Sequence, residues 1–193
     1  MTIVTVLIIV LLVALVAAGV VIARQRRSQQ LQEGFGPEYG RTLADRGDRQ
    51  EAESELRERR ERHEQLEIRE IEPEARERYA ERWLGAQSTF VDRPGAAVGE
   101  ADALVSEVMS ERGYPVEDDF DRRAADISVE HPVVVENYRS AHEISRRAVN
   151  DEASTEDLRQ AMIHFRALFG ELLGVDDQRR EETPDDINQE TRS

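Results

Sequence analysis

The sequence contains no cysteine and no lysine, so all 26 of its cationic Lys or Arg positions are arginine. The missing cysteine excludes disulfides, thiolate metal ligands and a catalytic thiol. The missing lysine excludes a P-loop lysine, Schiff-base chemistry and a Ser–Lys nucleophile. Several large classes of enzyme chemistry are therefore ruled out before any motif is considered.

Positive charge is also scarce overall. The chain carries 26 basic against 41 acidic side chains, which gives a formal net charge of −15 at pH 7. Proteins that bind nucleic acid need a basic surface to neutralise the phosphates. We therefore expect no nucleic-acid partner, and we expect the acidic part of the chain to be repelled by anionic lipid.

One long apolar run stands out against this charged background. Residues 3–23, IVTVLIIVLLVALVAAGVVIA, contain no charged side chain. A helix of this length covers about 31 Å at about 1.5 Å per residue, which matches the hydrocarbon core of a bilayer. The sequence predicts a single N-terminal transmembrane helix in contact with the lipid bilayer.

The charges that flank this run predict its orientation. Arg24, Arg26 and Arg27 follow it directly, whereas only Met1 and Thr2 precede it. The positive-inside rule then puts the N-terminus outside and the rest of the chain in the cytoplasm of a single-pass cell-membrane protein. The alternative is a cleaved signal peptide and a secreted helical protein, although the basic n-region of such a peptide is missing. Cleavage is left open.

The remainder of the chain is predicted to be all-α, because no stretch shows the alternating pattern of a strand. Apolar side chains recur at helical spacing, most clearly over 95–112, and Pro73 and Ser154 mark helix starts. We expect helices over 48–67, 73–92, 95–112, 119–127, 132–149 and from Ser154 to about residue 172, with a short one between Pro37 and Gly47.

These helices divide the chain into five segments. They are a transmembrane helix (1–23), a juxtamembrane segment (24–47), a charged helix and link (48–72), a helical bundle (73–173) and a disordered acidic tail (174–193). The charged helix has no continuous apolar seam, so we expect a solvated spacer or docking face rather than a coiled coil. Within it, Glu53 and Arg57 have the spacing of an i,i+4 ion pair.

No catalytic, cofactor-binding or metal-binding residue can be assigned. A zinc-protease helix needs a second histidine four residues after the first. Position 67, four after His63, is Glu, and position 146, four after His142, is Arg. An enzyme is thus less favoured than a binding module. The alternative is an unrecognised hydrolase or metal-dependent enzyme that uses His142, His164 or paired carboxylates in a cleft between helices.

The stretch RGYPVEDDF over 112–120 is a candidate interaction loop. Loops often present aromatic and acidic side chains to partners, and this one carries Tyr114, Pro115, Asp118 and Asp119. The competing interpretation is an ordinary helix connection in which Tyr114 packs against the bundle.

Four segments of the sequence resemble those of a known group of proteins. They are EARERYAERW (74–83), TFVDRPGAAVGEADALVSEVMSERGYPVEDD (89–119), SVEHPVVVENYRSAH (128–142) and STEDLRQAMIHFRALF (154–169). They are similar to an actinobacterial group of single-span membrane proteins that have a helical soluble domain and no assigned activity. The resemblance implies membrane anchoring and a bacterial source, and it transfers no catalytic residue.

Together these observations predict a membrane-anchored helical module that binds or scaffolds another protein. The identity of that partner and the oligomeric state are not encoded in any recognisable pattern.

Overall fold

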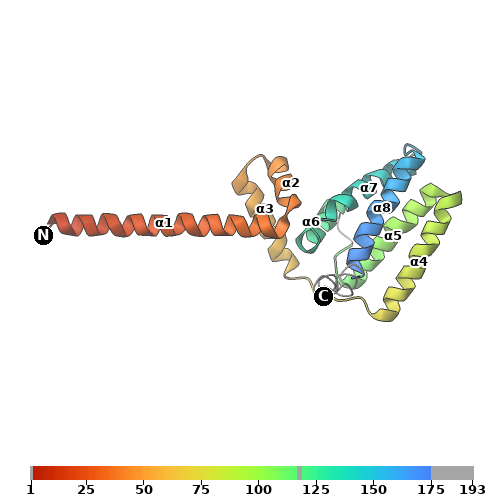
Figure 1. The fold of residues 1–193 in the computed structure, drawn as a ribbon, viewed down its shortest axis with the longest axis horizontal. Helices are drawn as coiled ribbons and strands as arrows, with labels where there is room; N and C mark the ends of the chain where they lie inside the picture. The colour runs from red at the N-terminus through yellow and green to blue at the C-terminus, as the bar shows by residue number, and fades with distance from the viewer. Residues whose placement is uncertain (1, 117–118, 175–193) are drawn as a thin grey trace, which may run out of the picture. The chain divides into compact units, whose positions relative to one another are not determined.

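The computed structural model describes residues 2–116 and 119–174, and within these ranges all regular structure is helical (Figure 1). The prediction of an all-α fold is confirmed. Side chains are described for the same residues except 2–10, 13 and 14. The helices are α1 (Thr2–Phe35), α2 (Pro37–Arg46), α3 (Arg49–His63), α4 (Pro73–Asp92), α5 (Pro94–Arg112), α6 (Phe120–Glu130), α7 (Val135–Val149) and α8 (Thr155–Leu172).

The chain forms two compact units, one that ends at Glu58 and one that begins at Arg59. The first holds α1, α2 and most of α3, and the second holds α4 to α8. The five-segment division of the sequence stays a prediction. Its last segment, the acidic tail, lies outside the described residues apart from Gly174.

Helix α1 runs without a break from the apolar segment into the arginine-rich segment that follows. Residues 24–35 continue it because Arg, Gln, Leu and Glu are all strong helix formers. It ends where Gly36 adopts φ 45° ahead of Pro37. Among the side chains that the structure describes, no helix combines the length and apolar character that a membrane crossing needs. The predicted span over 3–23 therefore has no support from the described residues.

In the first unit, hydrogen bonds hold α3 beside the second half of α1. The Ser28 hydroxyl donates to the Glu53 carboxylate at 2.6 Å, and the Tyr39 hydroxyl of α2 donates to the same oxygen at 3.0 Å. Arg49 donates to it at 2.8 Å. Burial acts to raise the pKa of Glu53, but the hydrogen bonds from Ser28, Arg49 and Tyr39 outweigh it and lower that pKa. The Glu53 carboxylate thus links α1, α2 and α3 through hydrogen bonds.

Helix α3 differs from the solvated spacer that its composition predicts. Ala52 and Leu56, one turn apart, are fully buried. The solvated spacer is therefore wrong for this face of the helix, which is buried, whereas the alternative of a docking face stays a prediction. The expected i,i+4 pairing also differs, since Arg57 Nε donates to the backbone carbonyl of Glu53 at 2.9 Å.

In the second unit, α5 is the central helix and packs against α4, α7 and α8, while α6 packs on α7. Its apolar stripe is fully buried or nearly so, as the sequence spacing predicts. The stripe consists of Ala97, Val98, Ala101, Leu104, Val105, Val108 and Met109. Burial of this stripe stabilises the bundle, because one fully buried Val, Leu or Met side chain contributes roughly 1.5–3 kcal/mol.

Most helix ends of the bundle follow the local sequence signals. Pro73 opens α4, and Ser154 forms a capping box with Asp157 at the start of α8, as predicted. Two details differ from expectation. Val91 lies outside the buried face of α4 with 82% of its side chain exposed, and α7 begins at Val135 rather than directly after Pro132. Ala75 and Ala86 complete the α4 face instead.

Candidate functional site

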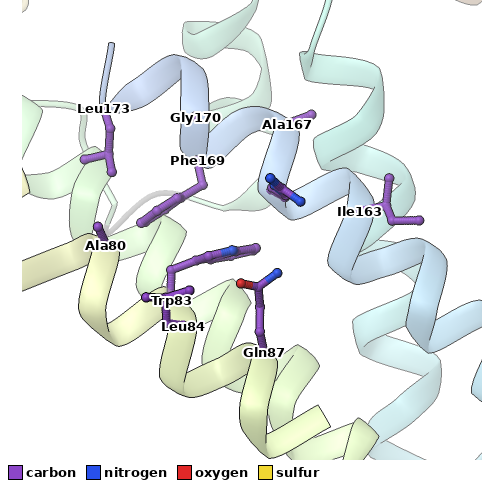
Figure 2. A pocket seen from close by; sticks show the side chains of 10 residues that line it. Ala80, Trp83, Leu84, Gln87, Ile163, Ala167, Phe169, Gly170 and Leu173 are labelled. Atoms are coloured by element: carbon purple, nitrogen blue, oxygen red, sulfur yellow. The ribbon is translucent and has the colours of Figure 1, made fainter. Parts of the chain in front are cut away.

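An open apolar groove of about 540 Å³ lies between α4 and α8. Both helices supply their side chains to it, as Figure 2 shows. The lining residues are Ala80, Trp83, Leu84, Gln87, Ile163, Arg166, Ala167, Phe169, Gly170 and Leu173. Small residues on both sides, namely Ala80, Ala167 and Gly170, leave the space that larger side chains would fill.

Two stacked aromatic rings join the walls of this groove. The ring of Trp83 on α4 and the ring of Phe169 on α8 face each other with centroids 4.8 Å apart and planes inclined by 21° (Figure 2). Both side chains are largely buried. Such offset-stacked pairs add roughly 0.5–1.5 kcal/mol to the area that they bury. The pair therefore fixes the spacing of α4 and α8 at the groove.

The open side of the groove carries exposed aliphatic side chains and two polar groups. Leu84 is 64% exposed and Ile163 is 47% exposed, and both side chains line the groove. Arg166 is exposed and has no carboxylate partner among the described residues. Gln87 supplies an amide that can donate and accept. The surface offers apolar contact with one cationic group beside it.

Ionic contacts between α4 and α5 hold the α4 wall in position. Arg82 pairs with Glu107, with one bond of 2.9 Å, and the Tyr79 hydroxyl donates to Glu111 at 2.6 Å. Burial and the acceptor Glu111 raise the pKa of Tyr79 to about 12. Tyr79 therefore stays protonated and keeps donating at any physiological pH. These contacts hold the α4 wall of the groove against α5.

A second, polar cavity of about 520 Å³ lies at the C-terminal end of α5, and Leu173 lines both this cavity and the groove. Arg112, Glu130, His131 and Glu171 are among its lining residues, and the Tyr114 hydroxyl donates to Glu130 at 2.5 Å. Arg112 contacts the same Glu130 oxygen at 3.5 Å and also donates to the carbonyl of Leu172 at 3.1 Å. Arg112 therefore links the end of α5 both to Glu130 at the end of α6 and to the Leu172 carbonyl at the end of α8.

His131 is the histidine most perturbed by this cluster. Burial and the nearby positive charge of Arg112 lower its pKa, against the opposing effect of Glu130 and Glu171. Its Nδ1 is 3.6 Å from Glu171 and its Nε2 is 3.8 Å from Glu130. Both separations exceed a hydrogen bond, and Nε2 is buried without a partner among the described atoms. His131 is thus a neutral imidazole held beside two carboxylates at neutral pH.

His142, which the hydrolase alternative uses, lies in a different contact. Its ring stacks on Phe120 with centroids 3.8 Å apart, and its Nδ1 is 3.6 Å from Asp102. The hydroxyl of Ser145 donates to Asp102 at 3.2 Å and not to the imidazole. A serine nucleophile needs the histidine as its hydrogen-bond partner. The three residue types of a triad are close together here, but in an order that does not activate the serine.

Metal binding has no constellation to support it in the described ranges. No group of three or more His, Asp or Glu side chains there has a geometry that could hold an ion. The carboxylates and histidines around Glu130 share their space with Arg112, whose charge opposes a cation. The cluster is better suited to structural hydrogen bonding.

The candidate interaction loop is only partly at the surface. Tyr114 is 3% exposed and Pro115 is half-buried. Asp118 lies outside the described residues, and Asp119 caps α6 by accepting the Arg122 backbone N–H at 2.9 Å. The structure brings Tyr114 to the Glu130 cluster rather than to solvent. A role for this loop in partner binding stays a prediction.

The three arginines of the topology prediction separate into two groups. Arg24 and Arg27 line a cleft of about 540 Å³ together with side chains of α3, whereas Arg26 does not line it. Sequence reasoning missed both this cleft and the α4–α8 groove. The signal for the groove was Leu84 and Ile163, two aliphatic residues that lie off the buried stripes of their helices.

Comparison of the chain with known protein families, with curated proteins and with solved structures finds no match. The resemblance to actinobacterial single-span proteins therefore stays a prediction. Function has to be argued from the groove, the clefts and the apolar segment alone.

Proposed function

We propose that this protein is a membrane-anchored adaptor whose α4–α8 groove binds an amphipathic helix of a partner protein. Residues 3–23 are the anchor, and the helical bundle is on the cytoplasmic side. The observation that carries the proposal is the apolar groove with exposed Leu84 and Ile163 in its lining.

The anchor is supported by sequence and by exposure. The apolar run is long enough for a bilayer core, and all of its described large aliphatic side chains from Leu11 to Ile22 are about half exposed or more. Contiguous exposed apolar surface of this kind marks a site of contact with protein or membrane. The arginines that follow the run favour a cytoplasmic bundle.

The helical partner is supported by the shape and chemistry of the groove. Amphipathic helices bind in hydrophobic grooves through apolar side chains at i, i+3 or i+4, and i+7. The floor of stacked rings and the exposed Leu84 and Ile163 supply the apolar contacts. Arg166, which has no carboxylate partner in the described part of the chain, favours a partner with an acidic side chain beside its apolar face.

The anchor and its orientation are tested with the full-length chain carrying a C-terminal reporter. We expect the protein to stay with membranes after alkaline carbonate extraction and the reporter to work only in the cytoplasm. Release by carbonate would overturn the anchor. A reporter that is active only outside would favour the exported alternative.

The groove is tested by site-specific photocrosslinking in native membranes. A photoreactive residue at Leu84 or Ile163 is expected to crosslink to a partner protein, and mass spectrometry is expected to map the crosslink to an amphipathic helix. The control position is Val149, which is 83% exposed and does not line the groove. Arg166→Glu should reduce the Leu84 crosslink, because it reverses the charge that faces the partner.

Two results would contradict the partner assignment. Crosslinks from Leu84 to a second copy of this chain would make the groove a self-association surface. Crosslinks to residues 175–193 of the same chain would make it an internal binding site.

A further inference from the structure

We infer that the first unit contains a binding site for the phosphate of an anionic lipid headgroup. The site is the cleft lined by Arg24, Arg27, Asp48, Arg49, Gln50, Glu53 and Arg57, with a volume of about 540 Å³. We call it the arginine cleft. This inference rests on the proposed membrane anchor.

The cleft has a net positive charge in a strongly acidic protein. Four of its lining residues are arginines and two are acidic, which gives +4 − 2 = +2, whereas the whole chain carries −15. Arginine is the side chain best suited to phosphate, since its planar guanidinium forms two parallel hydrogen bonds to the oxygens. The lining therefore favours a phosphate over a cation or a neutral ligand.

The two acidic groups of the cleft are already engaged. Glu53 accepts hydrogen bonds from Ser28, Tyr39 and Arg49 through one oxygen. Asp48 accepts the backbone N–H of Glu51 at 2.9 Å and so serves the first turn of α3. Their charges are directed toward these donors, which reduces their repulsion of an anion in the cleft.

Three of the four arginines keep their charge available. Arg24 and Arg27 are exposed, and no described carboxylate pairs with Arg24, Arg27 or Arg57. Arg57 uses its Nε to bond the backbone carbonyl of Glu53, which orients the guanidinium and leaves its charge uncompensated. An incoming phosphate would supply the missing counter-charge.

The position of the cleft fits a lipid rather than a soluble anion. Arg24 is the first residue after the apolar run, and Arg27 follows about 6 Å beyond residue 23 along the unbroken helix α1. The headgroup layer of a bilayer is roughly 5–8 Å deep on each side. The Ser28–Glu53 bond holds α3 beside α1, so Arg49 and Arg57 join the arginines of α1 at the same cleft.

The test uses the full-length protein in neutral detergent and counts bound lipid by native mass spectrometry. The probes are phosphatidylglycerol, phosphatidylcholine and inorganic phosphate. We expect phosphatidylglycerol to be retained in preference to phosphatidylcholine. Arg27→Gln and Arg57→Gln should each weaken that retention about fivefold, the effect of one arginine near an anionic lipid surface.

Arg26→Gln is the matched control, because it removes the same charge from the same turn of α1 without altering the cleft lining. It should retain phosphatidylglycerol like the parent protein. Equal losses for Arg26→Gln and Arg27→Gln would overturn the site in favour of diffuse attraction. Equal retention of the two lipids would also overturn it, as would Arg57-dependent binding of inorganic phosphate without binding of phosphatidylglycerol.

Lipid retention in detergent is independent of topology in the cell. A chain that resists carbonate extraction but shows no preference for phosphatidylglycerol would refute the lipid site and leave the anchor standing. A chain released by carbonate would refute the anchor, and the lipid assignment would fall with it.

Discussion

The α-carbon of Gly113 lies directly against the backbone carbonyl of Glu67. A β-carbon at Gly113 would be only 2.4 Å from the Glu67 oxygen, and the residue also adopts φ 96°. The close approach comes from the link before α4, where the Arg69 N–H donates to the Arg112 carbonyl at 2.9 Å. One glycine therefore allows this link to pack against the end of α5.

We predict that Gly113→Ala destabilises the bundle by more than about 2 kcal/mol. The left-handed backbone alone costs a residue with a β-carbon roughly 1–2 kcal/mol, and the contact with a backbone oxygen adds to that cost. Gly99→Ala in α5 is the control, since its β-carbon would meet open space and alanine favours a helix by about 1 kcal/mol over glycine. Urea unfolding should show opposite shifts, and a neutral Gly113→Ala would contradict the packing.

Two neighbouring residues of α4 that line the groove should differ in how much they stabilise the bundle. Trp83→Ala is expected to destabilise the bundle by about 3–5 kcal/mol, because it removes a large buried ring and its partner's contact. Leu84→Ser, one residue further along α4, should change stability by less than about 0.5 kcal/mol because the side chain is exposed. Urea unfolding measures both. A large destabilisation by Leu84→Ser would show that the groove is part of the core.

Stability should fall in mild acid through His131. Its folded-state pKa is below the ordinary value of 6.5, so the unfolded chain takes up a proton there that the folded chain resists. The contribution of neutral His131 is complete above about pH 6.5 and is lost as the pH falls toward the lower folded-state pKa. The charged neighbours Arg112, Glu130 and Glu171 are present both in the parent protein and in the His131→Gln variant described next, so they are the same on both sides of the comparison.

The variant His131→Gln isolates this effect. Between neutral and mildly acidic pH, the free energy of unfolding should fall less steeply in His131→Gln than in the parent. Identical slopes in urea titrations at several pH values would show that His131 does not take up a proton on unfolding.

The capping box of α8 offers a local test. Ser154 and Asp157 exchange hydrogen bonds, with the Asp157 N–H donating to the Ser154 hydroxyl at 3.1 Å. Ser154→Ala should cost about 1 kcal/mol and Ser154→Asn should restore most of it, since asparagine is an equally good N-cap. Thermal unfolding of the two variants checks the order. Equal stability of the alanine and asparagine variants would mean that the cap is not used.

Local signals in the sequence accounted for much of the bundle. Pro73 and Ser154 marked helix starts, and the stripe from Ala97 to Met109 predicted the central helix, because proline geometry, capping and helical periodicity act over a few residues. Contacts between distant residues carry no such signal. The bond from Ser28 to Glu53 and the contact of Gly113 with Glu67 depend on folding that no short window contains.

The candidate sites were predictable to a smaller degree for the same reason. The positions of Arg24 and Arg27 directly after the apolar run predicted membrane topology. Their place in one cleft with Arg57 depends on the fold of the first unit. The loop at Tyr114 had the composition of a recognition element, yet Tyr114 is buried and donates its hydroxyl to Glu130. The exposed Leu84 side chain lines a groove only because α8 lies opposite α4 in the fold.

The continuity of α1 has a mechanical consequence. Helices bend most readily at glycine, proline or a bulge, and between Gly19 and Gly34 the helix α1 contains neither glycine nor proline. A rotation of residues 20–23 about the helix axis must therefore turn Ser28 by a similar angle, away from or toward Glu53. With the membrane anchor proposed above, a rotation of the end of the apolar segment would therefore strain the single hydrogen bond between Ser28 and Glu53.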